Sequence, residues 1–175
     1  VSDPFILKRE NTVFTSSEQF VNTMQPYAEV AAEELGVDTN VLIAQAALET
    51  GWGKAVGKLP GGESSYNLFN IKAQRGYEGD RYIQNTIEIK NGVAKTETAA
   101  FRSYNSYQES FNDYVDFIKN NPRYEDALNA SSDSFQYIDN IQQAGYATDP
   151  RYAEKIKNVM QSFGSEDKMN AEDFV

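Results

Sequence analysis

The segment Thr39–Thr50 constrains the fold more than any other part of the chain, because its pattern is helical yet apolar in nearly every direction. On a helical wheel at about 100° per residue, its Val, Leu, Ile and Ala side chains cover most of the circumference. Only Gln45 and Glu49 share a polar edge. A helix that is apolar all round is normally buried. The sequence therefore predicts a helical domain packed around this segment.

Helix signals lie on both sides of this central segment. Ser16 and Gln19 fit a capping box that opens a helix ending at Gly36, with a kink expected at Pro26. Asp38 is suited to cap the central helix, and a glycine follows its last residue. The remaining patterns predict a short helix over 66–73 and further helices over 106–118, from 121 onward, over 135–143 and over 149–163.

A β-hairpin is expected to interrupt the helices. The segments Arg81–Lys90 and 93–101 flank Asn91-Gly92, the strongest two-residue signal for a tight antiparallel turn. With these two residues in the turn, Glu88 lies opposite Lys95. Alternation places Tyr82, Gln84, Thr86 and Glu88 on a polar face toward solvent or a cleft, and Ile83, Ile87 and Ile89 on a packing face. The fold class is therefore mainly α (α+β).

The chain of 175 residues suits one domain, which we place at residues 16–164 and expect to be monomeric. Residues 1–15 are predicted to form a flexible extension, and residues 165–175 a disordered acidic tail. With 26 acidic and 16 basic residues the net charge is −10, which disfavours nucleic acid and anionic membranes as partners. No apolar run reaches the length of a membrane span, so no membrane insertion is expected.

The chain contains neither cysteine nor histidine, and this limits its chemistry. Disulfides, thiol catalysis and nucleophiles activated by histidine are excluded, which leaves carboxylates, Lys and Tyr for acid–base work. The commonest zinc ligand is missing, and no calcium-binding or phosphate-binding loop is recognisable. We therefore expect no metal and no cofactor.

Glu49 is the most informative single residue. A carboxylate in an apolar helix must be paired, neutralised or turned toward a cavity, and the helix contains no Lys or Arg. Burial and the negative end of the helix dipole would both raise its pKa. A carboxylic acid that stays protonated is what a glycosidase uses to protonate its leaving oxygen. The alternative is that Glu49 is partly exposed and only hydrogen-bonds to the turn at residues 51–53.

Three motifs carry a resemblance to a known family: residues 46–53 (AALETGWG), 65–72 (SYNLFNIK) and 144–150 (AGYATDP). In this order and spacing they resemble glycoside hydrolase family 73, and more narrowly the C-terminal peptidoglycan hydrolase domain of flagellar rod-assembly proteins. The likeness runs from about Phe20 to Phe163.

The resemblance implies a lysozyme-like fold, in which a helical lobe and a small β-hairpin lobe flank a glycan-binding cleft. It implies β-N-acetylglucosaminidase activity on peptidoglycan strands, between N-acetylglucosamine and N-acetylmuramic acid. It also implies local wall opening during rod assembly, export to the periplasm by the flagellar route, and rod-protein contacts through an N-terminal region outside this sequence.

The resemblance also assigns roles to residues. Glu49 matches the general acid and Glu88 the second carboxylate, while Tyr146 matches a cleft tyrosine that orients water or the substrate's acetamido group. Glu88 has an alternative role as a surface ion-pair partner of Lys95, and Tyr146 as a tyrosine packed on Pro150. The residues expected to bind the glycan are Gln45, Trp52, Tyr66, Asn67 and Thr86.

Several of these assignments have structural alternatives. Trp52 fits a core anchor as well as a cleft wall, and the motif that holds Tyr66 and Asn67 fits a loop-folding signature as well as a cleft lining. Phe69 and Asp113 are expected to support the structure.

The mechanism and the function each leave alternatives. An inverting mechanism places the two carboxyl groups roughly 6.5–9.5 Å apart and a nucleophilic one about 5 Å apart. The substrate's own acetamido oxygen is a third possible nucleophile. A muramidase or lytic transglycosylase would share the fold and the acid. From another class, the chain would be a catalytically idle glycan-binding module of the flagellar rod.

Overall fold

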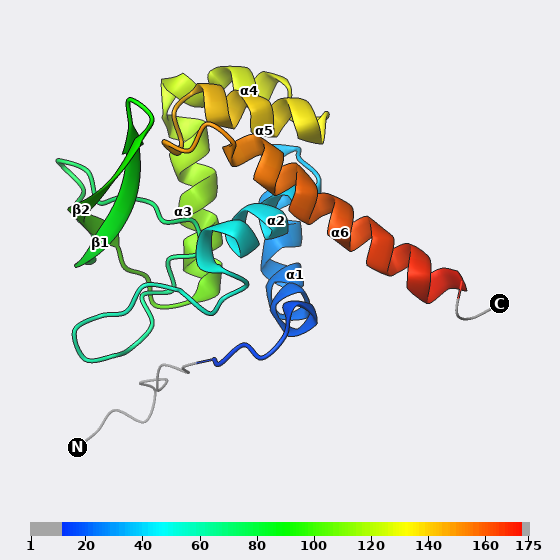
Figure 1. The fold of residues 1–175 in the computed structure, drawn as a ribbon, viewed down its shortest axis with the longest axis horizontal. Coiled ribbons are helices and arrows are strands. Elements are labelled where there is room, and N and C mark those ends of the chain that lie inside the picture. The colour runs from blue at the N-terminus through cyan, green and yellow to red at the C-terminus, as the bar shows by residue number, and fades with distance from the viewer. Residues whose placement is uncertain (1–11, 173–175) are drawn as a thin grey trace.

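The computed structural model describes residues 12–172, and the side chains of residues 12–163. Within this range the chain is mainly helical with one small antiparallel sheet, which confirms the predicted class (Figure 1). The elements in chain order are α1 (Ser17–Leu35), α2 (Thr39–Thr50), β1 (Arg81–Lys90), β2 (Val93–Arg102), α3 (Tyr107–Asn120), the 3₁₀ helix η1 (Pro122–Tyr124), α4 (Glu125–Asn129), α5 (Ser134–Gln143) and α6 (Tyr152–Glu172).

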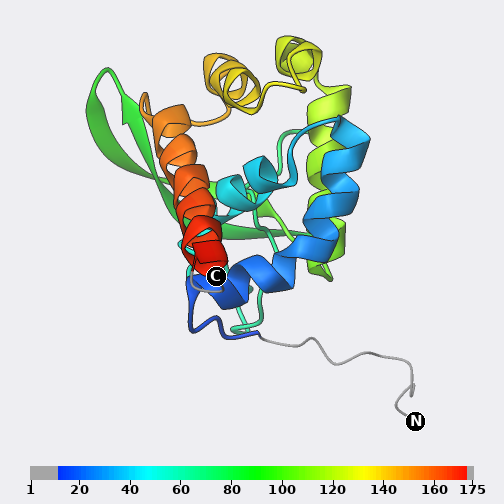
Figure 2. The ribbon, with the colours of Figure 1, turned by 90° about the vertical axis from the view of Figure 1, so that its right-hand side faces the viewer.

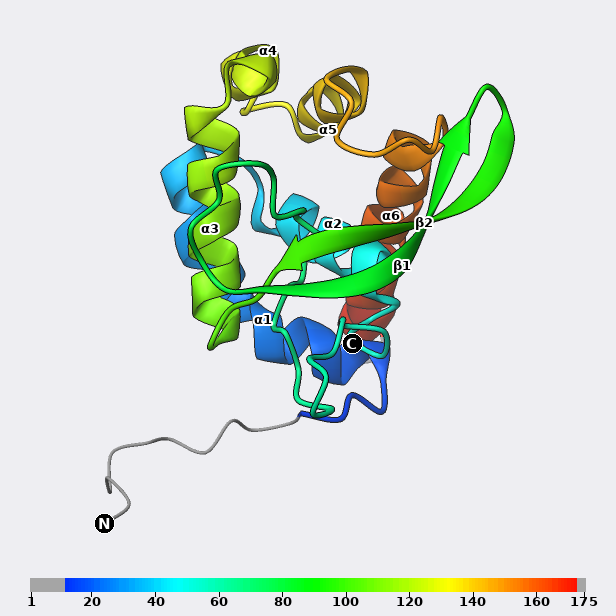
Figure 3. The ribbon, with the colours of Figure 1, turned by 90° about the vertical axis from the view of Figure 1, so that its left-hand side faces the viewer.

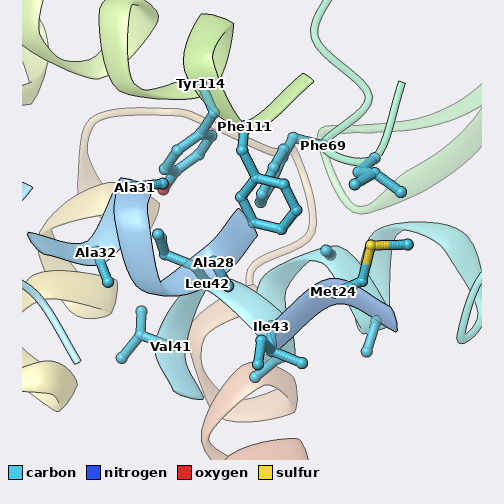
Figure 4. Packing of buried hydrophobic residues seen from close by; sticks show 14 of the residues in the cluster. Met24, Ala28, Ala31, Ala32, Val41, Leu42, Ile43, Phe69, Phe111 and Tyr114 are labelled. Atoms are coloured by element: carbon cyan, nitrogen blue, oxygen red, sulfur yellow. The ribbon is translucent and has the colours of Figure 1, made fainter. Parts of the chain in front are cut away.

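The apolar helix α2 lies at the centre of the molecule, as predicted. It packs against α1 and α6, and α1 packs against α3, so that helices surround α2 in both Figure 1 and Figure 2. Figure 4 shows Val41, Leu42 and Ile43 leaving α2 in different directions, each into buried surroundings. Each aliphatic side chain buried in this way contributes about 1.5–3 kcal/mol. The core therefore holds α2 rigidly, and with it any side chain at its end.

Local signals set the limits of the first two helices. Ser16 Oγ accepts from the backbone N–H of Gln19 at 3.0 Å, which is the first half of the predicted capping box. The Gln19 side chain, however, accepts from Thr15 N, one residue earlier than the box predicts. Pro26 lies inside α1, which bends along its length in Figure 2 because proline removes a helix hydrogen bond and crowds the preceding turn. Gly36 ends α1 at φ 73°, a left-handed conformation.

The predicted short helix over 66–73 is wrong, because side-chain hydrogen bonds replace helical ones there. The Asn67 amide nitrogen donates to Ile71 O at 3.0 Å and to Arg102 O at 2.9 Å. Its amide oxygen accepts from Ile71 N at 3.2 Å. Asn70 has φ 50°, outside the right-handed helical region. Asn67 therefore shapes this segment as a loop and ties it to the end of β2.

The hairpin has the predicted register. Lys90 pairs with Val93 and Glu88 with Lys95, and the turn residues Asn91 and Gly92 both have positive φ, at 51° and 76°. Two positive φ values are characteristic of the type I′ turn that an Asn-Gly pair favours.

The prediction of which hairpin face packs is wrong. Ile83 and Ile87, assigned to the packing face, are 63% and 69% exposed, whereas Tyr82 and Glu88 on the other face are buried. The hairpin projects beside the helices, so only the face turned toward them is covered (Figure 3). Tyr82 anchors this face, because its hydroxyl lies so close to Gly57 that a Cβ there would be 2.0 Å away.

The chain ends differ from expectation where they are described. Phe14, assigned to a flexible extension, is only 4% exposed and packs edge-on against Phe20. Helix α6 continues to Glu172 although the sequence predicts its end at Gly164, since one glycine costs a helix only about 1 kcal/mol. Residues 1–11 of the predicted extension and 173–175 of the predicted tail lie outside the described residues. Among the described helices, none combines the length and apolarity needed to cross a bilayer.

Candidate active site

A cavity of about 460 Å³ lies between the hairpin, the loop after α2 and the start of α6. The three residues predicted to be catalytic, Glu49, Glu88 and Tyr146, all line it, together with Thr86. Elements far apart in the sequence thus bring two carboxyl groups and a phenol to one cleft. No group of three or more acidic side chains that could share a metal ion occurs among the described residues.

Glu49 lies at the end of α2 and turns its carboxyl group into the cleft. Asn70 Nδ2 donates to Glu49 Oε2 at 2.8 Å and to its backbone oxygen at 2.9 Å. Burial raises the pKa of Glu49, hydrogen bonds from Asn70 and Tyr152 oppose this in part, and the charge of Glu88 raises it further. Within the described part of the chain, no Lys or Arg forms an ion pair with Glu49. Glu49 therefore favours its protonated form.

A buried hydrogen-bond network on the interior side of Glu49 positions the residues that contact its carboxyl group. Tyr114 OH donates to Gln45 Oε1 at 2.6 Å, and Gln45 Nε2 donates to Tyr152 OH at 3.0 Å. Because the Tyr152 oxygen accepts this bond, its own proton is available to the Glu49 carboxyl group. Gln45 has no exposed surface, which corrects the expectation that it binds the glycan. Its position gives it a supporting role behind the acid.

Glu88 reaches the cleft from β1 and is held by two partners on other elements. Lys72 Nζ lies 2.6 Å from Oε1, and Thr148 Oγ1 donates to Oε2 at 2.8 Å. Burial alone would raise the pKa of Glu88, but these two hydrogen bonds and the charge of Lys72 outweigh it and lower the pKa. The expected ion pair with Lys95 is replaced by the pair with Lys72. Glu88 is therefore ionised at neutral pH, and its pKa is shifted in the direction opposite to that of Glu49.

Thr148 fastens the hairpin to the loop between α5 and α6. Its hydroxyl donates to Glu88 and accepts from the backbone N–H of Ile89 at 3.0 Å. Thr148, Lys72 and Asn70 all lie inside the motifs that carry the family resemblance, but their contacts cannot be predicted from the motifs alone. A motif shows which residues belong together but not which atoms meet.

Thr148→Val is expected to lower kcat about tenfold. Valine keeps the shape of threonine but cannot bond to Glu88, so the pKa of Glu88 rises and the acidic limb of the pH profile moves to higher pH. The check is kcat as a function of pH on the glycan substrate that the family resemblance implies. Thr98→Val is the matched control, because it removes an exposed hairpin hydroxyl that bonds only to Asn85. If the two variants have identical pH profiles of kcat, Thr148 does not influence Glu88 during the reaction.

Tyr146 belongs to an aromatic wall of the cleft, formed by Phe117, Tyr124, Tyr146 and Tyr152. Its hydroxyl donates to Phe69 O at 2.6 Å, and its ring stacks on Tyr152 with centroids 5.8 Å apart. Burial, with the charge of Glu49 among the further causes, raises the pKa of Tyr146 well above its usual value. Tyr146 therefore stays protonated, so it serves as a hydrogen-bonding and packing group rather than as a base.

The other predicted glycan-binding residues separate into two groups. Thr86 lines the cleft, whereas Trp52, Tyr66 and Asn67 do not. Trp52 packs edge-on against Phe163 at 5.7 Å, so it is a core anchor. Tyr66 is buried, and Asn67 has no exposed surface because it holds the loop described above. Direct glycan contact by these three residues is therefore corrected to structural support of the cleft.

An ion pair anchors the base of the hairpin. Arg102 NH1 lies 3.0 Å from Asp113 Oδ2 on α3, and Arg102 Nε donates to Lys72 O at 3.2 Å. The same guanidinium lies over the ring of Phe117, which lines the cleft. Asp113 thus has the supporting position expected of it, and it helps to fix the backbone that carries Lys72.

The chain is similar to known proteins over most of its length. A model of the glucosaminidase family, described as mannosyl-glycoprotein endo-beta-N-acetylglucosaminidase, matches residues 25–165. The peptidoglycan hydrolase FlgJ of Vibrio parahaemolyticus is 55% identical over 152 residues, which cover 87% of this chain and 49% of that protein. That of Pseudomonas aeruginosa is 46% identical and is covered over 38% of its length. The chain thus spans about half, or less, of the length of these curated relatives.

Solved structures extend the likeness to the fold. The peptidoglycan hydrolase from Sphingomonas sp. A1 superposes with a TM-score of 0.76 at 39% identity, covering 88% of this chain and 94% of that one. The glycoside hydrolase domain of Salmonella typhimurium FlgJ gives a TM-score of 0.70 at 34% identity, covering 91% and 96%. The predicted lysozyme-like fold is confirmed, and the chain belongs to the glucosaminidase family, glycoside hydrolase family 73.

Proposed function

We propose that this domain hydrolyses peptidoglycan strands as a β-N-acetylglucosaminidase, between N-acetylglucosamine and N-acetylmuramic acid. The observation that carries the proposal is the pair of carboxyl groups in one cleft whose pKa values are shifted in opposite directions, upward for Glu49 and downward for Glu88. Such a pair provides an acid and a base at the same pH. The family and the names of the relatives support peptidoglycan as the substrate.

In this proposal Glu49 gives its proton to the glycosidic oxygen as the bond from the anomeric carbon breaks. Glu88 accepts a proton from a water molecule, whose oxygen forms the new bond to that carbon. The carboxylate left on Glu49 retains the hydrogen bonds from Asn70 and Tyr152, which limit the cost of the new buried charge. Exchange with solvent then returns a proton to Glu49 and removes one from Glu88.

A substrate-assisted route competes for the second half of this reaction. Both oxygens of Glu88 already have partners, Lys72 on one and Thr148 on the other. If these contacts persist with substrate bound, the acetamido oxygen of the sugar would attack the anomeric carbon, and Glu88 or Tyr146 would assist. Glu49 remains the acid in both routes.

Mass spectrometry of the digestion products tests the proposed bond. Purified peptidoglycan is digested, reduced with borohydride and analysed, and the expected new ends are reduced N-acetylglucosamine. Reduced muramic ends would identify a muramidase, and anhydro-muramic ends a lytic transglycosylase. Absence of soluble products under conditions where the folded protein binds the strands would identify an idle glycan-binding module.

The biological setting belongs to the same proposal. Because the relatives are FlgJ proteins, we place the activity at the cell wall during flagellar rod assembly, in the periplasm, with rod proteins as further partners of a longer protein. We expect the domain itself to act as a monomer. Cell fractionation and light scattering of the purified domain check the location and the oligomeric state.

A further inference from the structure

Among the described residues, one cation of the cleft has no acidic partner. Three basic side chains line the cleft, Lys72, Arg123 and Lys155. Lys72 is paired with Glu88 and Lys155 with Asp149. Among the described residues, no carboxylate forms an ion pair with Arg123. Its guanidinium carbon lies 5.1 Å from the centre of the Tyr124 ring, which is an aromatic face and not an anion.

This unpaired charge makes the cleft less acidic than the protein as a whole. The chain carries a net charge of −10. In the cleft, three cations face the carboxyl groups of Glu49, Glu88 and Asp149, and the raised pKa of Glu49 shifts this balance toward positive charge. An exposed arginine is usually only a solvated surface group. Here its position in the cleft of a strongly acidic protein makes it the local point where an anionic substrate group is not repelled.

The surroundings of Arg123 also fix where its charge lies. Arg123 follows Pro122 in η1, and the next residue, Tyr124, is fully buried. The Tyr124 ring packs against Phe117 at 5.5 Å and against Tyr146 at 6.2 Å. Arg123 is therefore carried at the edge of the aromatic wall next to the proposed catalytic groups.

We propose that Arg123 forms an anion-binding subsite of the cleft, which binds a carboxylate carried by a muramoyl residue of the glycan strand. The planar guanidinium presents paired N–H donors that match the two oxygens of a carboxylate. The carboxylate has two possible sources, the free lactyl group of a muramoyl residue without peptide or the acidic residues of its stem peptide. This subsite rests on the proposed function, since it takes peptidoglycan as the substrate.

The test compares the wild type with Arg123→Gln on three substrates. These are intact peptidoglycan, glycan strands stripped of stem peptides by an amidase, and intact peptidoglycan whose carboxyl groups have been amidated with carbodiimide and ammonia. Arg123→Gln is expected to raise the half-saturating substrate concentration about tenfold on a carboxylate-bearing substrate, with kcat unchanged. On the amidated substrate the two proteins are expected to perform equally. Arg81→Gln is the control, because Arg81 is exposed and does not line the cleft.

Binding without cleavage separates this proposal from the proposed function. Cosedimentation with the same substrates is measured for Glu49→Gln, alone and combined with Arg123→Gln. A loss confined to intact peptidoglycan supports the subsite with the stem peptide as the source, and a loss on stripped strands supports it with the lactyl group. Equal binding and equal kinetics on both carboxylate-bearing substrates, or the same loss on the amidated one, would overturn it. Failure of the wild type to cleave any substrate would contradict the proposed function, while the binding data would still decide the subsite.

Discussion

Glu49→Gln is expected to lower kcat on purified peptidoglycan by about three orders of magnitude, with little change in KM. The glutamine amide is too weak an acid to protonate the leaving oxygen, yet its side-chain oxygen can still accept from Asn70. The measurement is the rate at which soluble muropeptides are released. Glu34→Gln is the control, because it removes an exposed carboxylate from α1 and should keep the full rate. A Glu49→Gln enzyme that works at wild-type rate would exclude Glu49 as the acid.

The stability of the same variant separates lost chemistry from lost folding. A raised pKa means that the fold favours protonated Glu49, so its contribution to stability is complete below the ordinary pKa of 4.5 and is lost as the pH rises through the folded-state value. Removing the ionisable group is therefore expected to make Glu49→Gln more stable than wild type at neutral pH. The gain should vanish in acid. Thermal unfolding at several pH values checks this, and a variant less stable at neutral pH would contradict it.

Glu88→Gln is expected to lower kcat by about two orders of magnitude. The amide cannot accept a proton from water, and Lys72 loses its anionic partner in the cleft. Lys72 is partly exposed, so its unpaired charge remains solvated and the fold should persist.

The matched control for this variant is Glu97→Gln on the same hairpin. Glu97 also pairs with a lysine, Lys90, but it does not line the cleft, so this variant should keep its activity. If Glu88→Gln retains the activity of Glu97→Gln, activation of water by Glu88 is ruled out. The substrate-assisted route would then be the mechanism, with Glu49 alone as the protein's acid.

The sequence predicts those parts of the fold that are decided by neighbouring residues. The cap at Ser16, the apolar circumference of α2 and the Asn91-Gly92 turn each act within a few residues, and the structure confirms each of them. The predicted helix over 66–73 is wrong because the Asn67 side chain bonds to the backbone of Ile71 and to that of Arg102, which is 35 residues away. The periodicity of apolar residues cannot predict such side-chain hydrogen bonds.

In the candidate site too, features set by neighbouring residues can be predicted from the sequence, and features set by distant residues cannot. The helical wheel of residues 39–50 identifies Glu49, because an ionisable side chain in a helix that is apolar on nearly all sides is unusual. The environment of Glu88 depends instead on Lys72 and Thr148, which are 16 and 60 residues away in the chain. The covered face of the hairpin was mispredicted for a related reason: a two-stranded sheet beside a cleft buries the face that meets the protein, whatever its hydrophobic pattern.

Carboxyl ¹³C NMR titration can show whether Glu49 is the protonated acid and Glu88 the ionised base of the cleft. Spectra of Glu49→Gln and Glu88→Gln assign the two signals in the wild type. We expect the pKa of Glu49 to lie above the ordinary value of 4.5 and that of Glu88 below it. Activity should then be lost in acid as Glu88 is protonated and lost in alkali as Glu49 ionises. A pKa of Glu49 at or below that of Glu88 would contradict the assignment of acid and base.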